Sequence, residues 1–132
     1  MPRKPSTQPN DVELAILRAL WDRGPSTVRQ VHDARSEAAG PHKSGYTSTL
    51  KMMQVMCDKG LLVRDESQRP QVFRPAVPEA QTQRRILADL IQKVFGGSAR
   101  ALVQRAVETE HVTPADLAEI RKLLKYSKGE KP

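Results

Sequence analysis

The chain has 132 residues and a formal net charge of +7. This length holds one small domain with a helical extension and excludes two large hydrophobic cores. Cys57 is the only cysteine, which excludes an intrachain disulfide and a thiolate zinc site. This cysteine usage fits a reducing, cytoplasmic location. The sequence has no run of about 18 apolar residues, so we expect no membrane insertion.

The first nine residues hold three prolines around Arg3 and Lys4. This composition cannot bury apolar area, so we expect residues 1–9 to form a flexible basic arm. Two interpretations of the arm are open: a mobile tail, or a segment that lies on phosphates or in a minor groove.

Two helices are predicted next. The first covers residues 11–23, because Asn10 is an N-cap residue followed by acidic residues and Gly24 ends the apolar stripe, which consists of Leu14, Leu17, Leu20 and Trp21. A shorter helix follows, with Ser26 or Thr27 as its N-cap, and stops at a Gly-Pro break.

A third helix is predicted over residues 46–59, because Gly60 readily accepts the left-handed conformation at a helix C-terminus. Residues 61–64 and 71–74 have the composition of two strands around a polar turn that carries Arg69. Three helices and a hairpin in this order predict a winged helix-turn-helix, which we assign to residues 10–75.

Only helices are predicted after this hairpin, and the fold class is therefore mainly α. The last helix begins at Thr113, an N-cap residue followed by Pro114. The apolar stripes of these helices exceed what one copy of the chain can bury, so we expect a second copy to cover them. We assign residues 76–126 to a helical dimerisation domain and residues 127–132 to a flexible tail.

The helix at 46–59 has two different faces. At about 100° per residue, Tyr46, Leu50, Met53 and Cys57 lie on one side, with Thr49 and Met56 beside them. The opposite side carries Thr47, Ser48, Lys51 and Val55. One face is therefore expected to pack, and the other is free to touch a partner.

DNA is the first partner to consider for the free face, because its hydroxyls and its lysine can bond to phosphates or base edges. We predict contacts from Thr47, Ser48 and Lys51. Tyr46 is expected to pack its ring inward and give its hydroxyl to a phosphate, and Arg69 and Arg29 are candidates for backbone contacts. The alternative is a merely solvated face.

Other chemistry has weak support. Met52, Met53, Met56 and Cys57 include soft-metal ligand types, but three of the four lie on or beside the packing stripe, which favours core filling. The histidines share no ligand spacing, and no phosphate-binding loop or nucleophile elbow is present. We therefore expect no metal, no cofactor and no enzymatic activity.

Five segments match, in order, the pattern of one family: residues 20–31, 45–51, 59–62, 73–75 and 95–98. On these residues the chain resembles the penicillinase-repressor (BlaI/MecI) family of bacterial winged-helix transcriptional repressors. The resemblance runs from about Asn10 to Tyr126. It implies a homodimer that binds a palindromic operator in double-stranded DNA and blocks transcription, with the helix at 46–59 in the major groove.

The resemblance also implies a partner. In family members that control β-lactam resistance, a membrane-bound metalloprotease sensor triggers cleavage at an Asn-Phe bond in the C-terminal helices. The residues that align with that bond are Arg105 and Ala106, which differ from the family's Asn and Phe. The resemblance therefore implies a proteolytic site here by its position in the chain and not by its residue types. Copper-responsive relatives carry a cysteine-rich C-terminal motif, and the end of this chain has no cysteine.

Two other functions stay open at this point. One is a protein-interaction adaptor, in which the winged helix meets a protein and the basic surface only aids solubility. The other is a metal or redox sensor built on Cys57. The operator, the regulated genes and the inducing signal do not follow from the sequence.

Overall fold

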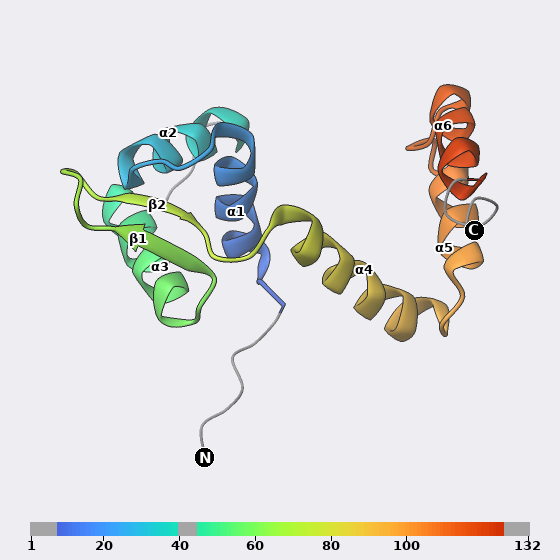
Figure 1. Cartoon of the computed structure of the whole chain (residues 1–132), viewed down its shortest axis with the longest axis horizontal. Coiled ribbons are helices and arrows are strands. Elements are labelled where there is room, and N and C mark those ends of the chain that lie inside the picture. The colour runs from blue at the N-terminus through green and yellow to red at the C-terminus, as the bar shows by residue number, and fades with distance from the viewer. Residues whose placement is uncertain (1–7, 40–44, 126–132) are drawn as a thin grey trace, which may run out of the picture. The chain divides into compact units, whose positions relative to one another are not determined.

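The computed structural model describes residues 8–39 and 45–125. Its elements follow in the order α1 (Asp11–Arg23), α2 (Val28–Ala39), α3 (Tyr46–Asp58), β1 (Leu62–Asp65), β2 (Val72–Pro75), α4 (Glu79–Phe95), α5 (Ala99–Glu108) and α6 (Pro114–Leu124) (Figure 1). The predicted fold class, a mainly α chain with a winged helix-turn-helix, is confirmed. Apart from its last two residues, the predicted arm lies outside the described residues, as does the predicted tail.

The chain divides into two compact units, of which the first ends at Ile86 and the second begins at Leu87. The division therefore falls within α4. The domain assignment, with its boundary after residue 75, stays a prediction.

Local signals set the limits of α1. The Glu13 amide donates to Asn10 Oδ1 at 2.8 Å, and the Asn10 amide donates to Glu13 Oε1 at 3.0 Å, which forms a capping box. At the other end Gly24 has a φ of 87° and donates to the Leu20 carbonyl. The predicted helix at 11–23 is confirmed.

The segment before α2 settles which residue caps that helix. Thr27 Oγ1 accepts from the Gln30 amide at 3.2 Å, and Gln30 Oε1 accepts from the Thr27 amide at 2.9 Å. Ser26 is instead buried and pairs with Phe73 through two backbone hydrogen bonds. Thr27 is thus the cap, and Ser26 joins the start of α2 to the wing.

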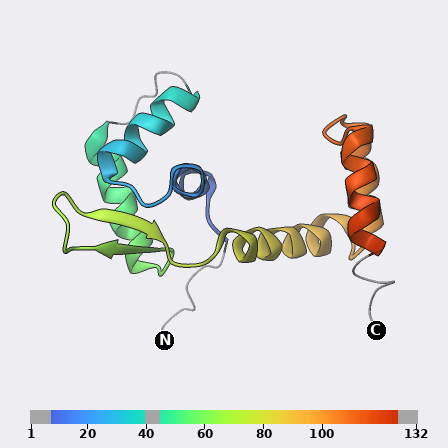
Figure 2. The same cartoon turned by 45° about the horizontal axis from the view of Figure 1, so that its top comes forward.

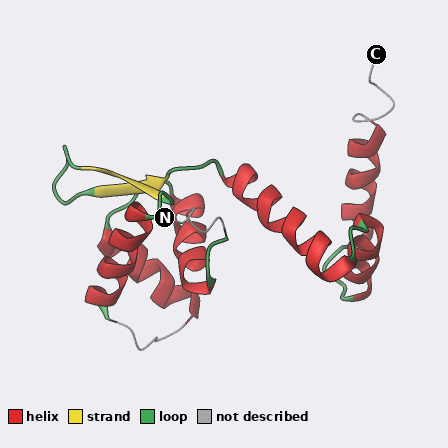
Figure 3. Ribbon diagram, turned by 90° about the horizontal axis from the view of Figure 1, so that it is seen from below, coloured by secondary structure: helices red, strands yellow, loops and turns green. Residues whose placement is uncertain are grey.

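β1 and β2 form an antiparallel hairpin, with Val63 opposite Arg74 and Arg64 opposite Phe73. Both strands lie one residue later than predicted, and α3 ends one residue earlier. Leu61 was predicted to open the first strand, but its amide bonds to the Met56 carbonyl and so closes the helix C-terminus. The hairpin is the only sheet in the described residues, and its tip projects away from the three helices (Figures 2 and 3).

The core of the first unit contains side chains from α1, α2, α3, β1 and β2. Its buried apolar side chains are Ile16, Leu17, Leu20, Val28, Val31, Met53, Met56, Leu62 and Phe73. Ile16 was not among the residues predicted to pack, whereas Leu14, which was, is only half-buried. The reason is that α1 contacts α2, α3 and β2, so its buried surface is wider than one stripe.

One ion pair has a buried carboxylate. Glu13 is 1 % exposed, and its Oε2 accepts a hydrogen bond from Lys59 Nζ at 2.6 Å. Its other oxygen holds the Asn10 amide, so both carboxylate oxygens are satisfied. The pair ties the start of α1 to the end of α3.

The helices of the second unit have well-formed ends but no buried side chain. Ser98 caps α5, and Thr113 forms a capping box with Asp116 at the start of α6. No residue of α4, α5 or α6 is buried. Across residues 8–39 and 45–125, no helix is long and apolar enough to cross a bilayer.

Candidate nucleic-acid interface

α3 presents a polar face to solvent. Thr47, Ser48 and Lys51 are all exposed, as predicted. The packed face is rotated from the prediction: Thr49, Met53 and Met56 are its most buried residues. This rotation follows from packing on three sides, because α1, α2 and β1 all contact α3.

The start of α3 is suited to an anion. Gly45 is the N-cap residue and provides no side-chain hydrogen bond to the first turn. Unsatisfied amides and the helix dipole make such an end attractive to phosphate. The exposed hydroxyls of Thr47 and Ser48 lie in this same turn.

Tyr46 is held by two side chains of α2. The guanidinium carbon of Arg29 lies 4.4 Å from the centre of the Tyr46 ring, a cation–π contact. The His32 ring meets the same ring edge to face, with centroids 6.2 Å apart. Tyr46 is nonetheless 36 % exposed, so its ring packs along the surface and not into the core.

A buried hydroxyl joins α2 to α3 behind this surface. Thr49 Oγ1 accepts from Arg35 Nη1 at 3.3 Å and lies 3.0 Å from Nδ1 of His32. Sequence reasoning missed both α2 residues. The spacing of Arg29, His32 and Arg35 places all three on one helix face, which was a usable signal, but their partners on α3 were not predictable.

The wing has a turn with a defined shape. Asp65 Oδ1 accepts from the Ser67 amide and hydroxyl, and Oδ2 accepts from the Gln68 side chain. These bonds, chiefly that of the Ser67 hydroxyl, hold the pKa of Asp65 below its ordinary value. Arg69 follows in this turn and is exposed.

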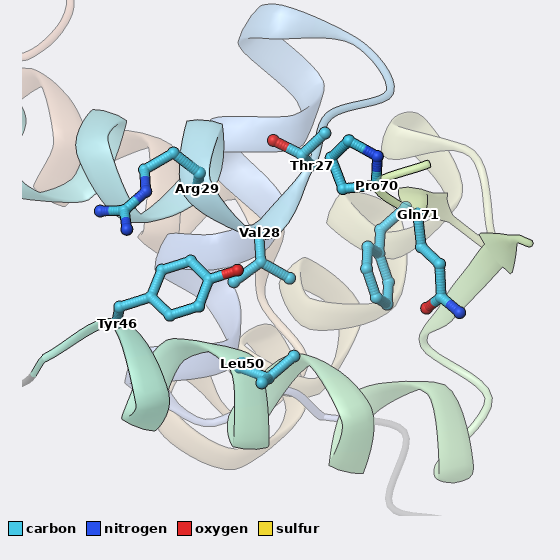
Figure 4. Close-up of a pocket in the computed structure, with 8 residues that line it drawn as sticks. Thr27, Val28, Arg29, Tyr46, Leu50, Pro70 and Gln71 are labelled. Carbon is cyan, nitrogen blue, oxygen red and sulfur yellow. The ribbon is translucent and has the colours of Figure 1, made fainter. Parts of the chain in front are cut away.

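A hollow of about 190 Å³ lies between the start of α2, the start of α3 and the end of the wing turn (Figure 4). Val28, Leu50 and Phe73 line its apolar floor, and Arg29, Tyr46 and Gln71 line its polar sides. The structure thus brings together two of the predicted site residues, Tyr46 and Arg29, with Gln71, which the sequence did not single out.

The methionines of α3 belong to the core or pack against it. Met53 and Met56 are fully buried, which agrees with the packing interpretation. Cys57 beside them is half-buried, and burial raises the pKa of its thiol above the ordinary value. Within the part of the chain that is described, no three His, Cys, Asp or Glu side chains are grouped to hold a metal.

The predicted proteolytic position lies inside α5. The Arg105 side chain is exposed and pairs with Glu108 at 2.6 Å. The Ala106 carbonyl accepts a bond from the Thr109 hydroxyl at 2.8 Å. A protease that needs an extended substrate would have to unwind this turn, and cleavage here stays a prediction.

Comparison with known families supplies the remaining observation. The family model for the penicillinase repressor matches residues 10–126. The chain belongs to the penicillinase repressor family. The family predicted from the sequence is thereby confirmed over nearly the whole described chain.

Penicillinase repressors are DNA-binding transcriptional repressors with a winged helix, and as a family they are not enzymes. A comparison with curated proteins gave no match. The winged helix-turn-helix of this chain is assigned through its family and through its own architecture.

Proposed function

We propose that this member of the penicillinase repressor family binds a palindromic operator as a homodimer and thereby blocks transcription in the cytoplasm. The observation that carries the proposal is the exposed polar face of α3, where Thr47, Ser48 and Lys51 stand free above a buried stripe. A helix in the second position of a helix-turn-helix reads base edges in the major groove through such a face.

The charge of the chain supports a polyanionic partner. The net charge is +7, and Arg29, Lys51 and Arg69 lie on α2, α3 and the wing. Neutralising phosphates with such side chains releases counterions and favours association at low salt. Lys51 and the hydroxyls then add contacts that depend on sequence.

The surface of the second unit supports the homodimer. Large apolar side chains are exposed on all three of its helices: Leu87, Leu90, Val94, Val103, Val107, Ile120, Leu123 and Leu124. Their burial is worth about 25 cal/mol per Å², so leaving them in water is costly. The same helices of a second copy offer a matching apolar surface and a twofold axis that fits a palindrome.

Lys51→Ala tests the α3 assignment. Binding of the intact protein to a duplex selected from a random pool, and to a scrambled duplex, is measured by fluorescence anisotropy. We expect affinity for the selected duplex to fall about tenfold or more, with the melting temperature unchanged. Lys125→Ala removes an equal charge from an exposed position outside the first unit and is the matched control.

Two results would count against the proposal. Unchanged binding by Lys51→Ala removes Lys51 from the site. Equal and weak binding of the unaltered protein to both duplexes, together with a stable protein complex, favours the adaptor function instead.

A further inference from the structure

The hollow beside Tyr46 has the size and the lining of a binding site. Its volume, about 190 Å³, is several times the ~30 Å³ that a water molecule takes up in the liquid. Its floor is rigid, since Val28 and Phe73 belong to the buried core. Ligand sites typically combine such an apolar floor with a few polar groups directed at one place.

The polar groups around the hollow are available. Among the described residues, the Arg29 guanidinium forms no ion pair, and its contact is with the Tyr46 ring. Neither the Tyr46 hydroxyl nor the Gln71 side-chain amide has a hydrogen-bond partner within the described ranges. Figure 4 shows the Arg29 guanidinium and the Gln71 amide at opposite sides of the apolar floor, with the Tyr46 hydroxyl between them.

These groups define the chemistry of the occupant. Donors on opposite sides of the hollow, of which one is a cation, call for a ligand with acceptor oxygens at both ends. The apolar floor calls for a compact, weakly polar ring between those ends. A deoxyribose with the phosphates on its two sides has these parts.

The position of the hollow favours a DNA strand as the source of that group. Tyr46 directly precedes Thr47 and Ser48 on the exposed face of α3, and Gln71 follows closely after Arg69 on the wing. A strand that passes from the major groove at α3 toward the wing would cross the hollow. This step rests on the proposed DNA-binding function.

We propose that this hollow, the backbone seat, holds one deoxyribose of the operator strand against Val28, Leu50 and Phe73. Arg29 pairs with the phosphate on one side of this deoxyribose, to which the Tyr46 hydroxyl also donates a hydrogen bond, and the Gln71 amide donates to the phosphate on the other side. The seat fixes the depth at which α3 enters the groove and reads no base.

Substitutions in the seat should therefore weaken all DNA binding alike. We expect Tyr46→Phe, which removes only the hydroxyl, and Gln71→Ala each to lower affinity about three- to tenfold on selected and scrambled duplexes. Gln81→Ala, on the exposed surface of α4, is the control and should change neither affinity. Melting temperatures of the variants check that each is folded.

The decisive experiment couples a protein change to a single phosphate. Selected duplexes are made with one neutral methylphosphonate at each backbone position in turn, and bound by the intact protein and by Arg29→Ala. We expect one position per half-site where the neutral group lowers the affinity of the unaltered protein about tenfold but leaves the affinity of Arg29→Ala unchanged. The same position should be coupled to Tyr46→Phe.

Additive losses at every position would overturn the backbone seat. In that case discrimination between selected and scrambled duplexes by the unaltered protein leaves the operator function standing. If the unaltered protein does not discriminate between the two duplexes, the proposed operator function, on which the seat rests, is itself excluded.

Discussion

The two units of this repressor treat their apolar side chains in opposite ways. In the unit that ends at Ile86, nine apolar side chains are buried in a core shared by helices and wing. In the unit that begins at Leu87, α5 and α6 bury no residue, and Leu123 is 65 % exposed. The first unit buries its own apolar side chains, whereas those of the second unit stay exposed in a single copy of the chain.

The charged side chains show the same contrast. Glu13 and Lys59 form a pair whose carboxylate is buried, and it joins two distant segments of the chain. Asp89 and Lys93 form a pair at 3.1 Å along one exposed helix face. Pairs of the second kind contribute about 0–1 kcal/mol, so the second unit gains little stability from its charges.

The largest effect is expected from charges placed in the apolar surface of the second unit. Leu90→Asp with Leu123→Asp should lower the self-association constant by at least about a hundredfold, because each buried leucine contributes about 1.5–3 kcal/mol. Sedimentation equilibrium measures the change. Gln104→Asp, at an exposed polar position of α5, is the control.

If the double variant keeps the molecular mass of the unaltered protein in solution, the apolar surface of the second unit is not the surface that self-associates. If the variant is monomeric while its first unit melts as before, that surface serves only the second unit.

A core truncation should give the next largest effect. Phe73→Ala empties the centre of the first core and should lower its free energy of unfolding by about 3–5 kcal/mol in urea denaturation. Val63→Ala changes an exposed residue of the same hairpin and should cost less than about 1 kcal/mol. Equal costs would show that the hairpin is not part of the core.

Removing the buried carboxylate should cost less. Glu13→Gln keeps an acceptor for the Asn10 amide but leaves Lys59 without its partner, and we expect a loss of about 2 kcal/mol in the same assay. Asp89→Asn breaks the exposed pair and should cost about 0.5 kcal/mol or less. A smaller loss for Glu13→Gln than for Asp89→Asn contradicts the difference drawn between the two pairs.

The smallest effect is a pH dependence of the wing. The pKa of Asp65 is lowered in the folded chain, so its hydrogen bonds stabilise the turn above the unfolded pKa. This contribution is lost as the pH falls through the lower, folded pKa. The amide resonance of Ser67 should titrate in the folded protein at a lower pH than in a short peptide of the turn, and equal midpoints would exclude the predicted shift.

Local sequence signals predicted the helices well. Asn10, Gly24 and Thr113 act on their immediate neighbours, so caps and stops could be predicted without a tertiary structure. The burial of Ile16 could not, because it depends on how many elements surround α1. The choice between Ser26 and Thr27 required the bridge from Ser26 to the wing.

The candidate site was predictable in part, because some of its features depend on one helix alone and others on contacts between helices. The exposure of Thr47, Ser48 and Lys51 follows from the period of one helix. The packed face of α3 was predicted about one position away, because its true centre at Thr49 is fixed by His32 and Arg35 of α2.

The backbone seat could not be predicted at all from periodicity. Its walls come from three segments of the chain, and Gln71 acquires its place only when β2 pairs with Ser26 and β1. Nothing in the neighbourhood of Gln71 in the sequence distinguishes it from other polar residues of the turn.

The most direct test of the account is selection of bound DNA from a random pool by the purified protein at physiological salt. We expect a palindromic sequence with half-sites about 10 bp apart or a multiple of that, bound orders of magnitude better than a scrambled duplex. Such a motif requires both a base-reading α3 and a twofold dimer. Recovery of no enriched sequence, with equal weak binding to both duplexes, would contradict operator recognition.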